Sequence, residues 1–251
     1  MIALITGATS GIGKATAQLL AQKGYNLILT GRRNQLLQPI AEALRSTHQV
    51  QVETLCFDVR NNGEVVQAMA SLPASRTMID VLVNNAGLAA GLSKIQDGLL
   101  EDWEDMIDTN VKGLLYMSKI VMKYMIQRQS GHIINIGSIA GKQVYPNGNV
   151  YCGTKHAVDA ISNSMRIDLL EHGIKVTAIH PGMVETEFSL VRFKGDAQKA
   201  KQVYHGLQPL SGDDIANTIF WAISQPDHVN INEITITPKA QANAYISVRQ
   251  Q

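Results

Sequence analysis

The sequence predicts an α/β fold built on one parallel sheet, and two observations support this prediction. Short apolar runs rich in β-branched residues alternate with longer segments whose apolar residues recur at helical spacing. Strands separated by helices of this length form βαβ units, which place neighbouring strands parallel. The runs are apolar almost throughout, as expected for strands covered by helices on both faces. We therefore expect a single Rossmann-type, doubly wound domain over residues 1–251, with about seven strands.

Seven apolar runs are the expected strands: 2–6, 26–30, 51–59, 81–87, 132–138, 175–182 and 233–238. Helical spacing is clearest in 12–23 and 112–128. The segment 188–210 breaks the alternation, because it is charged and follows the carboxyl end of the sixth run. Ligand sites of open α/β sheets lie at the carboxyl ends of strands. We therefore expect 188–210 to be a mobile flap over a site.

The composition fits a globular protein with a sizeable core, since 45% of the residues are hydrophobic and 17% are charged. The formal net charge of +1 gives no reason to expect nucleic acid or an acidic membrane surface as a partner. No apolar run is long enough for a membrane span, and the start of the chain lacks the regions of a signal peptide. We expect a soluble, cytoplasmic protein.

The chain has two cysteines, Cys56 and Cys152, and no C-x-x-C pair. Neither a disulfide framework nor a zinc site is expected, and no metal site is predicted. Cys152 follows Tyr151 and is either a reactive thiol or, as is usual for free cysteine, a small packing residue.

The first strand is followed by a glycine-rich turn, TGATSGIG at 6–13, that enters the first expected helix. Glycines let backbone N–H groups approach a pyrophosphate, and the helix N-terminus adds free donors and a favourable dipole. An ordinary glycine turn is the alternative, but the place between the first strand and the first helix favours a dinucleotide site. The residues expected to bind the cofactor here are Gly7, Thr9, Ser10, Gly11, Ile12 and Gly13.

The residues after the second and third strands indicate which dinucleotide binds. Arg32 and Arg33 stand where a carboxylate would bind the ribose of NAD, and two arginines instead suit the 2′-phosphate of NADP(H). A solvated basic turn is the alternative. Asp58 and Val59 end the third strand, where the Asp side chain and the Val backbone are expected to meet the adenine ring, unless Asp58 caps the next helix.

The fourth strand ends in NNAG, residues 84–87. An asparagine pair can brace neighbouring backbone, whereas a simple Asx turn is the alternative. The small residues leave room for a flat cofactor, so we expect Asn85, Ala86 and Gly87 to contact it.

Four polar residues form a candidate catalytic set. Ser138 ends the fifth strand, and Tyr151 and Lys155 share one face of a helix expected to begin near residue 151. A phenol with a pKa of about 10 serves poorly at neutral pH, and a nearby ammonium lowers that pKa by favouring the phenolate. Ser138 can hydrogen-bond the substrate oxygen, and Asn110 can hold a water that passes protons on. For Tyr151 and Lys155, the alternative is an ordinary surface pair.

Together these motifs resemble the short-chain dehydrogenase/reductase family over nearly the whole chain. The resemblance is carried by TGATSGIG (6–13), NNAG (84–87), Asn110, Ser138, YCGTK (151–155) and PGMVET (181–186). It implies that Tyr151 is the general acid/base and that Lys155 binds the nicotinamide ribose and lowers the tyrosine pKa. It further implies that Ser138 positions the substrate and that Asn110 completes a proton relay. The residues that it places along the nicotinamide carboxamide are Pro181, Gly182, Val184 and Thr186.

A narrower resemblance is to the NADP-dependent 3-hydroxy acid dehydrogenases, which act on serine and allo-threonine. Its segments are GRRNQLL (31–37), DVRN (58–61), LVNNAGLAAG (82–91), EDWEDMIDTNVKGLLYM (101–117), GHIINIGSIAG (131–141), TEFSLVRFKGD (186–196) and HVNINEITITP (228–238). It implies oxidation of small 3-hydroxy acids, reduction of 3-oxo acids such as malonic semialdehyde, and a homotetramer. Many NADP-using members of the broad family carry a basic residue at the position of Ser10. NADP(H) preference is therefore expected to depend on Arg32 and Arg33.

A small carboxylate substrate needs a cation, and Arg192 and Lys194 on the flap are candidates. Solvated loop charges are the alternative for both. For assembly, the amphipathic stretches 112–128 and 154–172 either pack between subunits or only cover the sheet.

Three other functions are compatible with parts of this pattern. A broad carbonyl reductase would share the catalytic set. A 3-oxoacyl reductase with a carrier-bound substrate would need a basic docking patch, and neither 88–100 nor 188–206 provides a convincing one. A non-catalytic NADP-binding regulator is disfavoured, because Tyr151 and Lys155 are both present.

Overall fold

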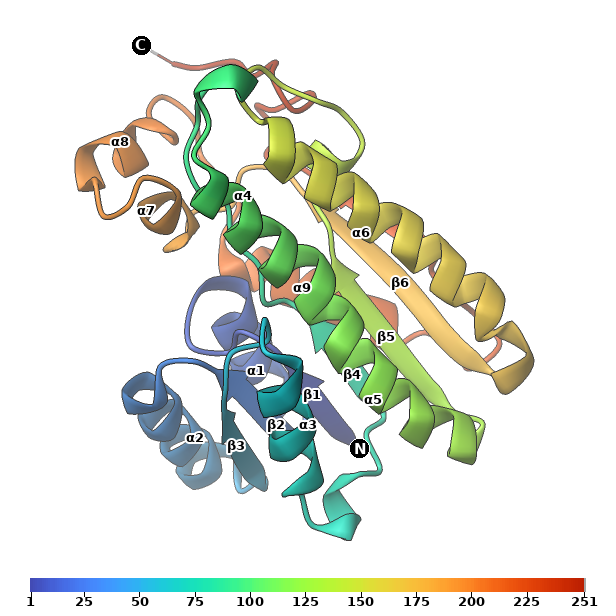
Figure 1. The fold of residues 1–251 in the computed structure, drawn as a ribbon. Helices are drawn as coiled ribbons and strands as arrows, with labels where there is room; N and C mark the ends of the chain where they lie inside the picture. The colour runs from blue at the N-terminus through green and yellow to red at the C-terminus, as the bar shows by residue number, and fades with distance from the viewer. Residues whose placement is uncertain (251) are drawn as a thin grey trace.

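The computed structural model describes residues 1–250 as one seven-stranded parallel sheet with helices on both faces (Figure 1), which confirms the predicted fold class. The strand order is β3-β2-β1-β4-β5-β6-β7. The strands are β1 (Ile2–Ile5), β2 (Asn26–Gly31), β3 (Val52–Cys56), β4 (Val81–Asn84), β5 (Gly131–Ile136), β6 (Ile174–Pro181) and β7 (Glu233–Ile236). Each begins within a residue of its apolar run, and several end earlier than expected.

The crossovers between strands are helical. The α helices are α1 (Gly11–Gln22), α2 (Asn34–His48), α3 (Asn62–Ala70), α4 (Leu100–Ile107), α5 (Leu114–Arg128), α6 (Asn149–Asp168), α7 (Phe188–Arg192), α8 (Ala197–Gln202) and α9 (Gly212–Ile223). A π-helical turn, Asp108–Gly113, joins α4 to α5. Across residues 1–250, no helix combines the length and apolar character needed to cross a bilayer.

Two apolar layers hold the helices on the sheet. On one face α3, α5 and α6 pack through residues such as Met69, Met117 and Met165. On the other face α1, α2 and α9 pack through residues such as Leu20 and Ile219. Burial of each such side chain stabilises the fold by about 1.5–3 kcal/mol, so the sheet is a rigid base for the loops at its edge.

The chain reverses its winding direction between β1 and β4, which lie side by side in the sheet. The carboxyl ends of these two strands lead into the glycine-rich turn and into NNAG. In open α/β sheets, the crevice at such a reversal is where ligands bind. The topology therefore brings the motifs at 6–13 and 84–87 to one place.

The segment 188–210 folds into α7 and α8, which lie together beside α4 in Figure 1. Its base is closed by a backbone bridge between Val184 and Leu210. Near its start it is held by a hydrogen bond from the Gly91 N–H to the Arg192 carbonyl (3.0 Å) and by an ion pair between Lys194 and Asp102 (2.8 Å). The predicted flap is thus a helical segment that contacts the loop after β4 and the start of α4, and its mobility stays a prediction.

Candidate active site

The glycine-rich turn joins β1 to α1 and packs on the end of β4. Gly7 has a φ of +66°, in the left-handed region that favours glycine. A Cβ on Gly13 would collide with the Gly7 carbonyl oxygen and would lie 2.5 Å from the Asn85 amide nitrogen. That amide donates to the carbonyls of Thr6 (2.8 Å) and Gly7 (3.2 Å), so Asn85 braces this turn, as expected, instead of closing a local Asx turn.

Arg33 brings a positive charge to the glycine turn from the start of α2. Its guanidinium donates to the hydroxyls of Thr9 (2.9 Å) and Ser10 (3.0 Å), and it pairs with Glu187 at 2.9 Å. A phosphate at this turn would meet the Arg33 charge together with the free N–H groups at the start of α1. The glycine turn has Ser10 where a basic residue could stand, and Arg33 brings a positive charge to the turn from the start of α2.

Arg32 lies beside Asp58, with 3.5 Å between its guanidinium and the carboxylate. Burial raises the Asp58 pKa, but the hydrogen bonds and charge of Arg60 outweigh burial and leave the pKa below its ordinary value. The interpretation of Asp58 as a helix cap is wrong. Asn61 caps α3 and accepts from two backbone N–H groups of that helix, at 3.0 and 3.3 Å. Val59 is buried beneath this edge.

Ser138 and Tyr151 are brought together by a close approach of two elements. Ser138 follows β5, and its hydroxyl accepts from the Ala140 N–H (3.0 Å) in a short 3₁₀ turn. A Cβ on Gly141 would lie 2.5 Å from the Lys155 carbonyl oxygen, so only glycine lets this turn rest on α6. The Ser138 side chain lies close enough to Tyr151 to lower the pKa of its phenol.

Lys155 lies one helical turn after Tyr151 on α6 and is buried. Its ammonium donates to the Ile136 carbonyl (2.9 Å) and lies 5.9 Å from the centroid of the Tyr151 ring. A Cβ on Gly87 would come within 3.6 Å of the same ammonium. The surface-pair alternative for Tyr151 and Lys155 is therefore wrong, since both side chains are less than one-tenth exposed.

The Asn110 side chain lies in the π-helical turn and links three elements. Its carbonyl oxygen accepts from the Leu88 N–H (2.8 Å), and its amide donates to the Leu88 carbonyl (2.8 Å) and to the Thr154 hydroxyl (3.0 Å). The side chain thus fixes the loop after β4 against α6. π-helical turns inside helical runs are frequent at functional sites.

Burial opposes ionisation of both members of the Tyr151–Lys155 pair. It raises the pKa of Tyr151 to about 12, and the positive charge of Arg192 acts in the opposite direction. Burial also lowers the pKa of Lys155 to about 8. In this structure the phenol is therefore neutral near pH 7 and can donate a proton, and positive charge nearby is needed to make it a base.

Arg192 lies over Tyr151, a position that the sequence motifs do not reveal. Its guanidinium carbon is 4.9 Å from the Tyr151 ring centroid and 5.3 Å from that of Phe188. It donates to the Tyr145 hydroxyl at 2.8 Å. The interpretation of Arg192 as a solvated loop charge is wrong, whereas Lys194 is exposed and paired with Asp102. Arg192 is held over Tyr151 by contacts with Phe188 and Tyr145. The spacing of these residues in the sequence does not predict those contacts.

A small pocket opens beside Tyr151 and Arg192. It lies between the loop after β4, the start of α4 and the loop before α6. Its lining includes Leu99, Asp102, Trp103, Met106, Tyr151 and Arg192. Cys152 is buried among neighbouring apolar side chains, and burial raises its thiol pKa, so it fits the packing interpretation.

The loop after β6 closes the other side of the site. Gly182 donates its N–H to the Ile236 carbonyl (2.7 Å), and the Thr186 side chain would lie 3.1 Å from a Cβ on Gly11. The buried Gln241 accepts from the Met183 N–H at 2.8 Å. Gln241 was not predicted, because it follows the last strand and lies far from every motif in the sequence.

Comparisons with known proteins agree with this geometry. The family model described as short chain dehydrogenase matches residues 1–196. A protein of Salmonella typhi named NADP-dependent 3-hydroxy acid dehydrogenase YdfG is 47% identical over 100% of both chains. Serine 3-dehydrogenase of Agrobacterium fabrum is 42% identical over 99% of this chain and 98% of its own.

Solved structures give the same result. "The Closed form of serine dehydrogenase complexed with NADP+" is 44% identical, covers 100% of both chains and has a TM-score of 0.93. Serine dehydrogenase from Escherichia coli is 40% identical, with a TM-score of 0.83 over 96% of this chain and 100% of its own. The resemblance carried by the sequence motifs is confirmed, and the chain belongs to the short-chain dehydrogenase family.

Proposed function

We propose that this chain is an NADP-dependent dehydrogenase of small 3-hydroxy acids, which also runs in reverse on the matching 3-oxo acids. The observation that carries the substrate class is the position of Arg192 over the Tyr151 ring. The relatives named for NADP, for 3-hydroxy acids and for serine support the same activity.

Arg192 is suited to receive a carboxylate. Among residues 1–250 its side-chain hydrogen bond goes to the Tyr145 hydroxyl and not to an acidic group, and its buried Nε has no hydrogen-bond partner there. The Tyr145 hydroxyl, its side-chain acceptor, is neutral. A half-buried guanidinium without an anion is costly, and a carboxylate would satisfy its charge and its free donor together. The alcohol carbon of a 3-hydroxy acid is two bonds from its carboxylate carbon, which suits two contact points as close as Arg192 and Tyr151.

The residues of the glycine turn fit NADP. Glycine at positions 7 and 13 keeps side chains out of the turn, and Arg33 with Ser10 and Thr9 offers one cation and two hydroxyls to a 2′-phosphate. Lys155 would hold the nicotinamide ribose, and Gly87 leaves space beside its ammonium. When bound, the nicotinamide accepts or supplies the hydride.

The proton is handled by Tyr151. In oxidation, the phenolate takes the proton of the substrate hydroxyl, and the charges of Lys155 and Arg192 favour the phenolate. In reduction, the neutral phenol returns the proton. Ser138 bonds the same substrate oxygen and holds it against Tyr151. Asn110 holds the loop after β4 against α6. Its position in a π-helical turn supports a role in a proton relay.

The substrate experiment compares kcat/KM for 3-hydroxypropionate with that for its uncharged methyl ester, in wild type and in Arg192→Gln. Two hydrogen bonds to a charged group contribute about 1.5–3 kcal/mol each, so the variant should lose about 10²–10⁴-fold on the acid. The ester should lose less than about threefold. Lys199→Gln, an exposed charge on the same segment, is the matched control and should change neither substrate.

Equal losses on acid and ester would mean that Arg192 only shapes the site, and the proposed substrate class would be wrong. Turnover restricted to hydrophobic alcohols would instead indicate a broad carbonyl reductase. Binding of NADPH without turnover of any alcohol or acid would indicate a non-catalytic protein.

We also propose a cytoplasmic homotetramer with 188–210 as a cover for bound substrate. Apolar side chains exposed along α5 and α6, among them Leu115 and Ile167, support an assembly surface. Contact of Phe188 with Tyr151, at 5.7 Å between ring centroids, supports the covering role. Light scattering behind size exclusion would test the assembly, and a monomer would contradict it.

A further inference from the structure

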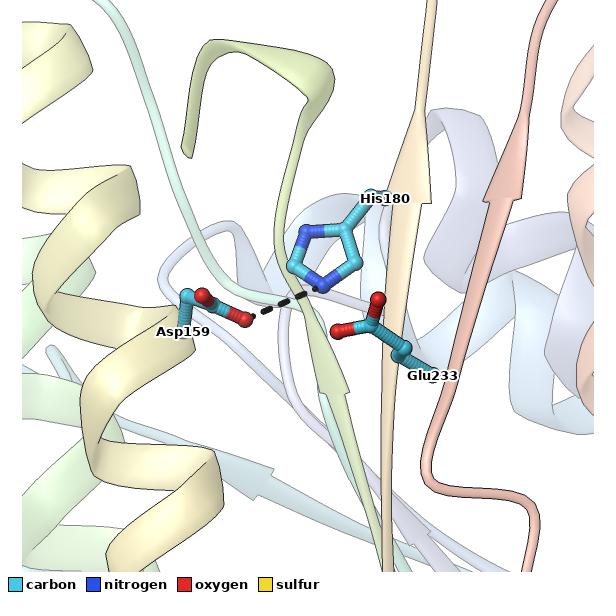
Figure 2. Close-up of side chains that lie close together, drawn as sticks. All are labelled: Asp159, His180 and Glu233. Atoms are coloured by element: carbon cyan, nitrogen blue, oxygen red, sulfur yellow. Dashed lines mark ion pairs between the residues drawn. The ribbon is translucent and has the colours of Figure 1, made fainter. Parts of the chain in front are cut away.

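A second group of ionisable side chains lies next to the Ser138 backbone, outside the lining of the pocket beside Tyr151. Asp159 comes from α6, His180 from the end of β6 and Glu233 from the start of β7 (Figure 2). Their ligand atoms lie within 4.8 Å of one another. Sheet register produces this convergence, because Glu233 lies opposite Ala178, two residues before His180 and on the same face of β6.

A hydrogen bond on one side of the His180 ring determines which ring nitrogen carries the proton. Nδ1–H donates to the Ser138 carbonyl at 3.3 Å, so a neutral ring carries its lone pair on Nε2. Nε2 is fully buried, has no hydrogen-bond partner within residues 1–250, and lies 3.4 Å from Oδ1 of Asp159. A lone pair facing a carboxylate oxygen is unfavourable unless a positive species lies between them.

We propose that Asp159, His180 and Glu233 form a binding site for a divalent transition metal, and specifically Zn²⁺. One imidazole nitrogen and two carboxylates are ligands that zinc accepts, with a fourth position left for water. Ligands about 2.1 Å from a tetrahedral zinc stand about 3.4 Å apart, which is the separation of Nε2 and Oδ1 here. A metal-bound histidine usually donates its other N–H to a carbonyl or carboxylate, as His180 does to Ser138.

The Lys142 ammonium would compete with a metal ion for the two carboxylates of this site. It donates to Asp159 (2.9 Å) and to Glu233 (2.7 Å), so it stands where a cation is favoured. One ammonium leaves two carboxylates with an excess negative charge, which Zn²⁺ would neutralise. The Lys142 side chain is nearly one-third exposed and can swing into water when the metal enters.

The other positive species that fits between Nε2 and Asp159 is a proton. Burial and the nearby Lys142 charge lower the pKa of His180, with Asp159 and Glu233 opposing them, so the imidazolium is disfavoured at neutral pH. The two possibilities predict different measurements, because an imidazolium binds no metal.

The test is metal binding to chelator-treated full-length protein, followed by calorimetry with Zn²⁺ and by the visible absorption of Co²⁺. Wild type should bind one Zn²⁺ per chain and give the strong bands of tetrahedral Co²⁺. Lys142→Met should tighten binding by about tenfold, because it removes the competing charge. His180→Gln should weaken it by at least about 100-fold. Lys119→Met and His228→Gln, exposed residues elsewhere, should leave the affinity unchanged.

Asp159→Asn keeps the shape of its side chain and should also weaken binding, which guards against a misfolded His180 variant. Thermal unfolding provides a second readout: Zn²⁺ should raise the Tm of wild type and of Lys142→Met, but not of His180→Gln. The proposal is overturned if Lys142→Met binds no Zn²⁺, or if binding survives in both His180→Gln and Asp159→Asn. An NMR spectrum with both His180 ring nitrogens protonated at pH 7 would show that a proton lies between Nε2 and Asp159, and it would also overturn the proposal.

Discussion

Replacing Lys155 with methionine should stabilise the fold at neutral pH while abolishing turnover. Burial lowers the Lys155 pKa from 10.5 to about 8, so keeping this side chain charged at pH 7 costs the native state about 3 kcal/mol. Methionine has a similar length and no charge, and it removes this cost. It also leaves the Ile136 carbonyl without its hydrogen bond, which costs about 1 kcal/mol. The desolvation term is larger, and the expected net gain is about 2 kcal/mol.

The gain should depend on pH with a definite sign. Between pH 8 and 10.5 the unfolded chain binds more protons at this residue than the native state does, so wild-type stability rises with pH through that window. Wild type should therefore recover most of the difference by pH 10. Urea unfolding of both proteins without cofactor, at pH 7 and pH 10, measures this directly. At pH 7 the Tm should rise by about 4–8 °C.

An exposed lysine on α5 gives the control: Lys119→Met should show no pH-dependent gain. A Lys155→Met protein that is no more stable than wild type at pH 7, or that gains equally at both pH values, would contradict a desolvation cost at Lys155.

Three further substitutions test other parts of the site. Tyr151→Phe should lower kcat by about 10²–10⁴-fold while NADPH affinity, followed by fluorescence, changes less than about twofold; a variant that keeps a tenth of wild-type kcat would contradict the acid/base role. Arg33→Leu should raise the Kd of NADP by about 10–100-fold and leave that of NAD unchanged, and equal weakening of both would mean that Arg33 does not read the 2′-phosphate. Gly13→Ala should destabilise the protein by about 1–3 kcal/mol and weaken binding of both dinucleotides, because its Cβ would meet Gly7 and Asn85; an unchanged urea midpoint would refute the close-approach argument.

The fold was predictable because its signals are local. Each βαβ unit has its own apolar run and its own helical periodicity, and both can be recognised in the sequence. Runs such as 2–6 and 81–87 then pair in parallel. Strand ends were harder to predict, because 51–59 continues as an apolar run beyond Cys56, where the backbone leaves the sheet. The π-helical turn at Asp108–Gly113 was also not predicted, since it depends on tertiary contacts of Asn110.

The site was predictable only in part, for a related reason. The glycine turn, Tyr151 and Lys155 lie within single elements, where spacing determines geometry. The placement of Arg192 over Tyr151, and of His180 beside Ser138, requires the flap and β6 to fold onto distant elements. Such long-range contacts leave no periodic trace in one sequence.

The charges around Tyr151 connect stability to substrate choice. Within residues 1–250, neither Lys155 nor Arg192 pairs with a carboxylate, and each donates to a neutral oxygen, that of Ile136 and that of Tyr145. An oxidised nicotinamide ring bound beside Tyr151 would add a third positive charge. A neutral alcohol would leave the Arg192 charge uncompensated, whereas a 3-hydroxy acid would bring one negative charge to it. Proton transfer to Tyr151 would move the phenolate charge to the substrate oxygen beside Ser138 and leave the total charge unchanged. The same cations that cost stability in the free protein would therefore favour an anionic substrate over a neutral alcohol.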